Sequence, residues 1–322
     1  KMTVQLLSAE PETVSRLRAK LLDPNTSLPE KYRVLFSLRN LAGKEAHEAL
    51  LTALKDQSAL FRHDVAFCLG QRQDAAAIDT LKAILHDPKE HAMVRHEAGE
   101  ALGAIGTEEC LVPLREHLQD PVQEVAETCQ LALQRIQDLA AGSGAGNKAD
   151  GTEESPYYSV DPTPALPAAT PTPELRAKLL DEASTMFDRY AALFALRNKG
   201  GVEAVRALGD AFTNCSSALL KHEVAYVMGQ MQDPTSAAIL ADVLKNGGEH
   251  AMVRHEAAEA LGAIADDATV ALLQSFAADP EPIVAHSCVV ALDMLEFEKS
   301  GAFEYADKGA DGAPVPRKAC MC

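Results

Sequence analysis

The sequence contains no tryptophan, and aromatic residues make up only 5% of its 322 residues. Because aromatic side chains are enriched in β-strands, their scarcity beside abundant alanine and leucine favours a helix-rich protein. Apolar residues nevertheless make up 47% of the chain. A chain of this length and composition has enough apolar side chains for a core and is typical of roughly two domains.

Paired cysteines, long apolar runs and an excess of positive charge are missing as well. The seven cysteines include no C-x-x-C pair, so we expect reduced thiols rather than a disulfide framework or a zinc knuckle. The chain has no signal peptide and no run of about 18 apolar residues, which predicts a soluble, cytoplasmic protein with no membrane partner. Its formal net charge of −17 argues against a nucleic-acid partner.

The most informative feature of the sequence is an internal duplication. HAMVRHEAGEALGAIG at 91–106 returns as HAMVRHEAAEALGAIA at 250–265, with two Gly/Ala exchanges. YRVLFSLRN (32–40) matches YAALFALRN (190–198), and HDVAFCLGQRQD (63–74) matches HEVAYVMGQMQD (222–233). The chain is therefore a tandem duplication, with an N-terminal half over 2–139 and a C-terminal half over 174–298.

The segment between the halves differs in composition from both. Residues 140–173 are rich in glycine and serine at their start and in proline afterwards. Proline removes a backbone donor and breaks helices, so this segment predicts a flexible, partly polyproline-like linker. We expect residues 299–322, after the second half, to be a disordered tail.

Each half is itself repetitive, with a period in the low thirties. Each repeat contains the pattern x-x-A-x-x-L-G or an equivalent of it. The position six residues before the leucine of this pattern is called the register position. It recurs at spacings of 31, 33 and 31 residues in the first half and of 32, 33 and 31 residues in the second. Such a period with helical patterning indicates paired-helix repeats, and the absence of TPR and ankyrin letter patterns favours HEAT-like ones. We predict an all-α fold of two four-repeat halves that face each other with pseudo-two-fold symmetry. The register residues are Tyr32, His63, His96, Glu127, Tyr190, His222, His255 and His286.

The inner two repeats of each half carry an acidic residue directly after the register histidine. These pairs are His63-Asp64, His96-Glu97, His222-Glu223 and His255-Glu256. On a helical wheel His96 lies opposite the apolar face that contains Val94 and Leu102, so it is not a core histidine. Equivalent side chains of neighbouring repeats meet on one surface, and two histidines with a carboxylate form a set typical of non-haem Fe(II) sites. Because no cysteine joins the set, zinc is a weaker candidate than iron or manganese.

VRHEAxEALGAI, present twice, and HEVAYVMGQ closely resemble the sequence of deoxyhypusine hydroxylase. The resemblance covers everything except the linker and the tail. It implies a monooxygenase with two non-haem iron ions per chain. This enzyme hydroxylates the deoxyhypusine side chain of translation initiation factor 5A to hypusine, with O₂ and an electron donor that the sequence does not identify.

Carried onto this chain, the resemblance implies that one iron is held by His63, His96 and Glu97, and the other by His222, His255 and Glu256. Asp64 and Glu223 then hold the substrate amine or support the site. The family pattern has glutamate where this chain has Asp64, which keeps the charge but shortens the side chain by one methylene.

Four further residues share a helix side with the expected ligands, and two readings of them stay open. They are either pocket or ligand-supporting residues, or ordinary residues of a helix surface: Met93, Met252, Glu100 and Glu259. An alternative for the whole protein is a non-catalytic HEAT-like scaffold that binds a protein partner. The four His-acid pairs argue against it, because a scaffold has no need of them.

Overall fold

The computed structural model describes residues 6–141, 155–157 and 159–300, and their secondary structure is helical apart from one parallel β-bridge between Leu7 and Leu41. Residues 142–154 of the expected linker, and the expected tail from 301 on, lie outside the described residues. Contacts divide the chain into two compact units with their boundary between Ile136 and Gln137. No helix of the described part is long and apolar enough to cross a membrane.

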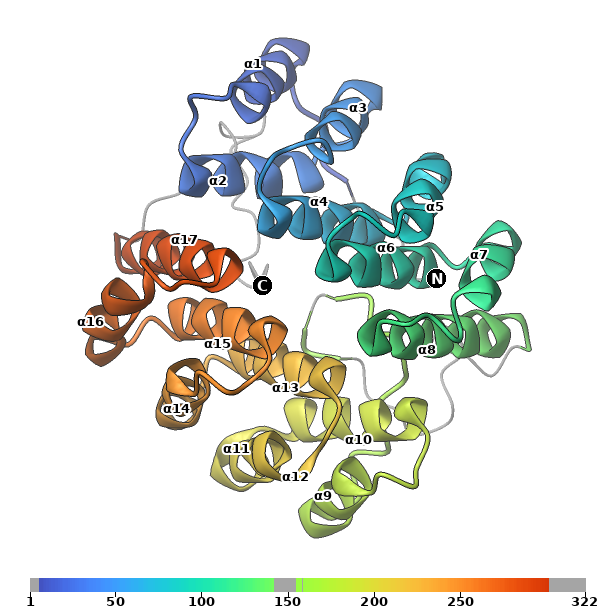
Figure 1. Cartoon of the computed structure of the whole chain (residues 1–322), viewed down its shortest axis with the longest axis vertical. Coiled ribbons are helices and arrows are strands. Elements are labelled where there is room, and N and C mark those ends of the chain that lie inside the picture. Colours follow the sequence, from blue (N-terminus) through green and yellow to red (C-terminus); the bar gives the residue numbers. More distant parts are fainter. Residues whose placement is uncertain (1–5, 142–154, 158, 301–322) are drawn as a thin grey trace. The chain divides into compact units, whose positions relative to one another are not determined.

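The N-terminal unit is a series of helix pairs (Figure 1). Its elements are α1 (Pro11–Leu22), α2 (Leu28–Arg39), α3 (Lys44–Ala53), α4 (Ala59–Arg72), η1 (Ala75–Ala77), α5 (Ile78–His86), α6 (Ala92–Ile105), η2 (Glu108–Cys110), α7 (Leu111–Glu116) and α8 (Gln123–Ala140). The second helix of each pair carries the register residue found in the sequence. These second helices, α2, α4, α6 and α8, are called the inner helices below.

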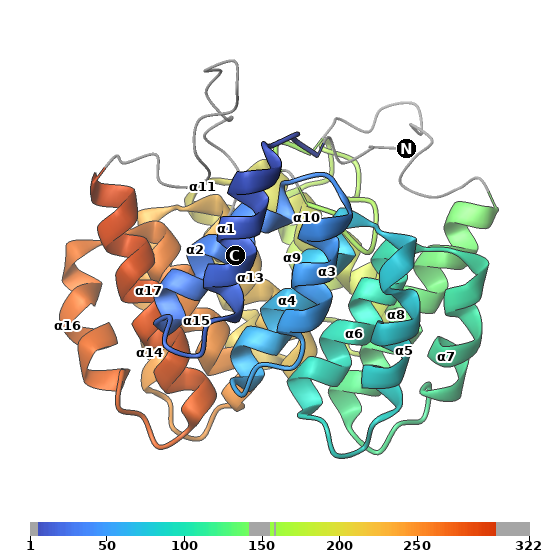
Figure 2. The same cartoon turned by 90° about the horizontal axis from the view of Figure 1, so that it is seen from above.

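The C-terminal unit repeats this order. Its elements are α9 (Thr172–Leu180), α10 (Met186–Lys199), α11 (Gly201–Gly209), α12 (Ala211–Asn214), α13 (Ala218–Met231), η3 (Pro234–Ser236), α14 (Ala237–Lys245), α15 (Ala251–Ile264), α16 (Asp267–Phe276) and α17 (Pro282–Ser300). Its inner helices are α10, α13, α15 and α17. Seen from above in Figure 2, paired helices such as α16 and α17 run side by side.

The inner helix α6 is buried on both sides. Val94 and Leu102 on its apolar side are fully buried, as the wheel predicts. His96 on the opposite side is fully buried too. The polar side of this helix is therefore not a solvated surface, and burying an imidazole there costs free energy unless it finds polar partners.

Three glycines let inner helices approach closely, namely Gly70, Gly103 and Gly262. A methyl group on Gly262 of α15 would lie 2.7 Å from the Cα atom of Ala291 in α17. It would also lie 2.8 Å from the carbonyl oxygen of Ala291. Gly103 of α6 stands in the same relation to Ala132 of α8, so both copies of the duplication use the same device.

Gly262→Ala should lower the free energy of unfolding by roughly 1–3 kcal/mol, because backbone atoms of α17 cannot move away as a flexible side chain could. Denaturant titration measures the effect. Gly99→Ala is the matched control, since a methyl there would lie at 3.4 Å from Thr128 Cγ2 and the equivalent residue is already Ala258. Equal stability of the two variants would contradict the close-approach explanation.

The second part of the expected linker packs against the C-terminal unit. The guanidinium of Arg197, fully buried in α10, donates to the Asp161 carboxylate at 2.5 Å and to Ser155 Oγ at 3.1 Å. The backbone N–H of Leu166 donates to the carbonyl of Ala191 at 3.0 Å. Ser155, Asp161 and Leu166 thus make polar contacts with α10, which composition alone did not predict. A buried guanidinium requires a counter-charge, and Asp161 supplies it.

Candidate metal centre

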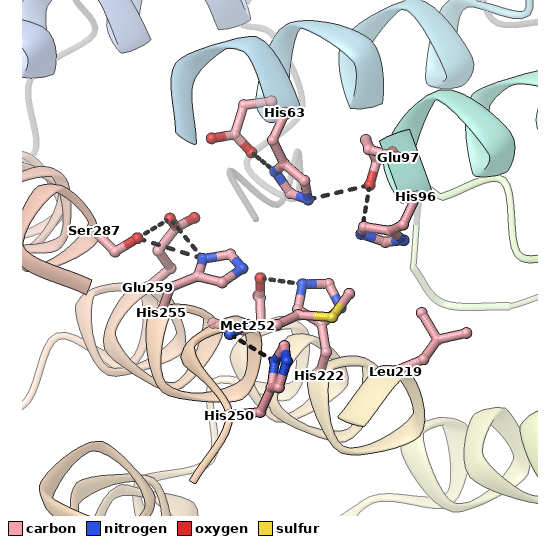
Figure 3. Close-up of polar contacts among 12 residues, drawn as sticks. His63, His96, Glu97, Leu219, His222, His250, Met252, His255, Glu259 and Ser287 are labelled. Atoms are coloured by element: carbon pink, nitrogen blue, oxygen red, sulfur yellow. Dashed lines mark hydrogen bonds and ion pairs between the residues drawn. The ribbon is translucent and has the colours of Figure 1, made fainter. Parts of the chain in front are cut away.

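Three of the expected ligands come together in the N-terminal unit. His63 stands on α4, and His96 and Glu97 stand on the neighbouring helix α6 (Figure 3). The Glu97 carboxylate lies 3.3 Å from His63 Nε2 and 3.7 Å from His96 Nε2. The two imidazole rings are 5.5 Å apart between centroids, and all three side chains are buried. Packing of α4 on α6 brings the repeated register position of one repeat beside that of the next.

Asp64 contacts His63 at Nδ1, the ring nitrogen that does not face Glu97. Its Oδ1 lies 3.2 Å from His63 Nδ1, and the hydroxyl of Tyr32 on α2 donates to its other oxygen. Burial alone lowers the pKa of His63, but hydrogen bonds and charge from Asp64 and Glu97 outweigh it. The pKa of His63 consequently lies well above the ordinary value for histidine. Without a metal, the two carboxylates therefore favour the protonated form of this imidazole.

Fe(II) binding should weaken as the pH falls, because a metal ligates the neutral imidazole and must displace the proton of His63. Since the pKa of His63 is raised, this competition extends to higher pH than it would for an ordinary histidine. Where His63 is mainly protonated, affinity should change by about tenfold per pH unit. Anaerobic Fe(II) titration of the metal-free protein between about pH 6 and about pH 8 measures it. Asp64→Asn, which removes one of the two charges, should flatten the dependence, and an equally steep dependence in that variant would contradict the explanation.

The C-terminal unit carries the equivalent set. His222 stands on α13, and His255 and Glu256 stand on α15. Glu256 Oε2 lies 3.2 Å from His222 Nε2, and the two rings are 5.2 Å apart between centroids. One ligand atom from each of the three residues lies within 4.8 Å of the others, and all three side chains are buried.

The donor chemistry of this set fits a metal ion. Glu256 Oε1 is buried and makes no hydrogen bond among the described residues, which is costly for a carboxylate oxygen without a cation. Two imidazoles and one carboxylate in this arrangement match the ligands of non-haem iron.

Proteins of known identity resemble the chain over nearly its whole length. HEAT repeats match residues 47–134 and 206–293. Deoxyhypusine hydroxylase of Danio rerio is 50% identical over 299 residues, 93% of this chain and 97% of the fish protein. Deoxyhypusine hydroxylase of Arabidopsis thaliana is 54% identical over 288 residues, 89% of this chain and 91% of the plant protein. The chain belongs to the deoxyhypusine hydroxylase family.

A solved structure of the deoxyhypusine hydroxylase family has the same fold. Human deoxyhypusine hydroxylase in complex with glycerol matches with a TM-score of 0.83 and 48% identity, over 89% of this chain and 96% of the human chain. The all-α, HEAT-like architecture that the repeat period predicts is confirmed.

The remaining residues expected at a deoxyhypusine hydroxylase site lie on the same helices. Met93, Met252 and Glu259 are buried, and Glu223 is buried beside His222. Glu100 is half-buried, and one of its oxygens lies within 4.8 Å of ligand atoms of His96 and Glu97. Glu100 is thus close enough to serve as a ligand itself, which the sequence did not indicate.

Three further residues at the sites are absent from the sequence-based set. Tyr32 contacts Asp64, Thr128 Oγ1 lies 3.2 Å from His96 Nδ1, and Ser287 Oγ lies 3.4 Å from His255 Nδ1. The positions of these three residues in the repeat could have indicated them. Tyr32 occupies the histidine position of an outer repeat, and Thr128 and Ser287 occupy the position where inner repeats carry the acid.

Proposed function

We propose that this protein hydroxylates the deoxyhypusine side chain of translation initiation factor 5A, using O₂, external electrons and two iron ions per chain. The observation that carries the proposal is the pair of buried sets of two histidines and one carboxylate on duplicated helices. The membership of the chain in the deoxyhypusine hydroxylase family supports it. Because the substrate is a translation factor, we place the activity in the cytoplasm.

His63, His96 and Glu97 would hold one iron, and His222, His255 and Glu256 the other. Bound iron supplies the redox chemistry that activates O₂ toward a C–H bond. The protein's own contribution would be to hold the two imidazoles and the carboxylate of each set on neighbouring helices. Because His96 and His255 are fully buried, the protein would keep bulk water away from a metal that they hold.

The substrate arm is slender and cationic, so acidic side chains beside the ligands are suited to its amine. Glu223 is the residue we assign to this contact. Asp64 already contacts His63 and Tyr32, which favours a role in holding the ligand. Met93 and Met252, both buried next to the ligand-bearing turns, would form apolar walls for the methylene part of the arm.

A scaffold without catalysis is the weaker explanation. Burying two imidazoles and a carboxylate together costs free energy, and this cost gives a protein-binding surface no advantage. HEAT-like helices can form such a surface with ordinary apolar residues in these positions.

The purified protein should contain about two irons per chain, since each unit offers one complete set of ligands. Metal analysis gives the number, and incubation with deoxyhypusine-bearing translation initiation factor 5A, O₂ and a chemical reductant should yield hypusine. A single metal per chain in the active protein, or zinc in preference to iron, would contradict the two-site proposal. If the protein binds two irons but forms no hypusine, the proposed metal sites stand and the proposed activity is wrong.

A further inference from the structure

Three buried side chains form a closed cluster behind the C-terminal metal site. Ser287, on α17, donates its hydroxyl hydrogen to Glu259 Oε1 at 2.8 Å. His255 Nδ1 lies 3.4 Å from Ser287 Oγ and 3.5 Å from Glu259 Oε1 (Figure 3). His255 and Ser287 are fully buried, and Glu259 is nearly so.

The hydrogen bonds of this cluster determine the tautomer of His255. A serine hydroxyl has one hydrogen, and here it points to Glu259. Both oxygens that face Nδ1 are therefore acceptors, so Nδ1 carries a hydrogen. In a neutral imidazole the lone pair then lies on Nε2, the nitrogen that is left for a metal.

The duplication contains the same hydroxyl in its other copy. Thr128, on α8, lies 3.2 Å from His96 Nδ1 through its Oγ1. Thr128 and Ser287 are equivalent in the repeat register, 32 residues after the histidine that each contacts. The residue type differs between the copies, while the hydroxyl and its contact are retained.

We propose that Ser287, together with Glu259, is a positioning residue that fixes His255 with Nε2 toward the C-terminal iron, and that Thr128 does the same for His96. The inference rests on the proposed iron sites and deepens them. Residues that orient a metal-bound histidine through its second nitrogen typically change metal affinity by about 10–100-fold when they are removed. This assignment makes Glu259 a support of the ligand and not a contact of the substrate.

The test is the rate at which iron leaves the protein. The metal-free protein is loaded anaerobically with Fe(II), and its transfer to an excess of chelator is followed by absorbance. Ser287→Ala should speed the release of one of the two irons by about 10–100-fold and leave the other unchanged. Ser287→Thr should restore the original rate, because threonine is what the other copy uses. Glu259→Gln should speed the same phase to a smaller extent, since the amide keeps an oxygen but loses the charge.

Ser275→Ala is the matched control, because Ser275 is exposed on α16 and donates only to the carbonyl of Leu272. It should release iron at the original rate. Thermal unfolding of the metal-free variants separates an effect on the metal from one on folding. If Ser287→Ala does not fold, Ser287→Thr and Glu259→Gln decide, and unchanged release from Glu259→Gln then overturns the inference.

The outcomes distinguish this inference from the proposal beneath it. An original protein that binds no iron removes the proposed function. If the unmodified protein binds two irons and a folded Ser287→Ala variant releases both at the unmodified protein's rates, only the positioning role is overturned.

Discussion

Replacing Glu256 with alanine should remove the iron of the C-terminal unit and abolish hydroxylation. Glu256 supplies the carboxylate of its set, and its Oε1 makes no hydrogen bond among the described residues. Losing a charged ligand costs metal-binding free energy directly, so the iron content should fall from about two to about one per chain. Turnover should fall by at least about a hundredfold, more than the loss of a residue that only supports a ligand. Metal analysis and a hypusine assay on the same preparation measure both effects.

Glu97→Ala should likewise remove the iron of the N-terminal unit and leave the iron of the C-terminal unit. Glu203→Ala is the control, because Glu203 is an exposed acid on α11 and should keep both irons and full turnover. If Glu256→Ala retains two irons, the assignment of this carboxylate as a ligand is wrong.

Glu223→Ala should leave iron in place and lose affinity for the substrate protein. Glu223 directly follows His222, a proposed ligand, and is buried, but the two histidines and Glu256 would already complete the set. Removing one partner of a buried charge pair costs about 2–5 kcal/mol. The KM for deoxyhypusine-bearing translation initiation factor 5A should therefore rise by more than about tenfold at saturating iron. Steady-state kinetics and metal analysis on one preparation separate the two effects.

Asp64 provides the internal comparison for this prediction. Because Asp64 contacts His63, Asp64→Ala should weaken iron binding by about 10–100-fold. The variant protein should still bind two irons when iron is saturating. Asp64→Glu, which introduces the glutamate of the family pattern, should retain iron. Loss of iron from both Glu223→Ala and Asp64→Ala to the degree seen in Glu97→Ala would make all four acids ligands.

The repeat architecture and most of the candidate site follow from local sequence. The all-α, HEAT-like fold is readable because helix pairs recur with a period in the low thirties, and a duplicated register brings equivalent residues of neighbouring helices together. His63 and His96 meet for this reason, as do His222 and His255. His91 and His250 cap the starts of α6 and α15. Each accepts a hydrogen bond from the backbone N–H two residues later, at 3.2 and 3.3 Å.

The surroundings of those residues depend on the tertiary structure. A helical wheel places His96 opposite the apolar face, but only packing buries that side as well. Ser287 reaches His255 because α17 lies against α15 at the glycine contact of Gly262, whereas Glu259 lies one turn after His255 on α15 itself. The contacts of Ser155 and Asp161 with α10 likewise depend on the buried charge of Arg197. Local sequence determines periodicity and residue type, whereas burial and hydrogen-bond partners depend on which helices come together.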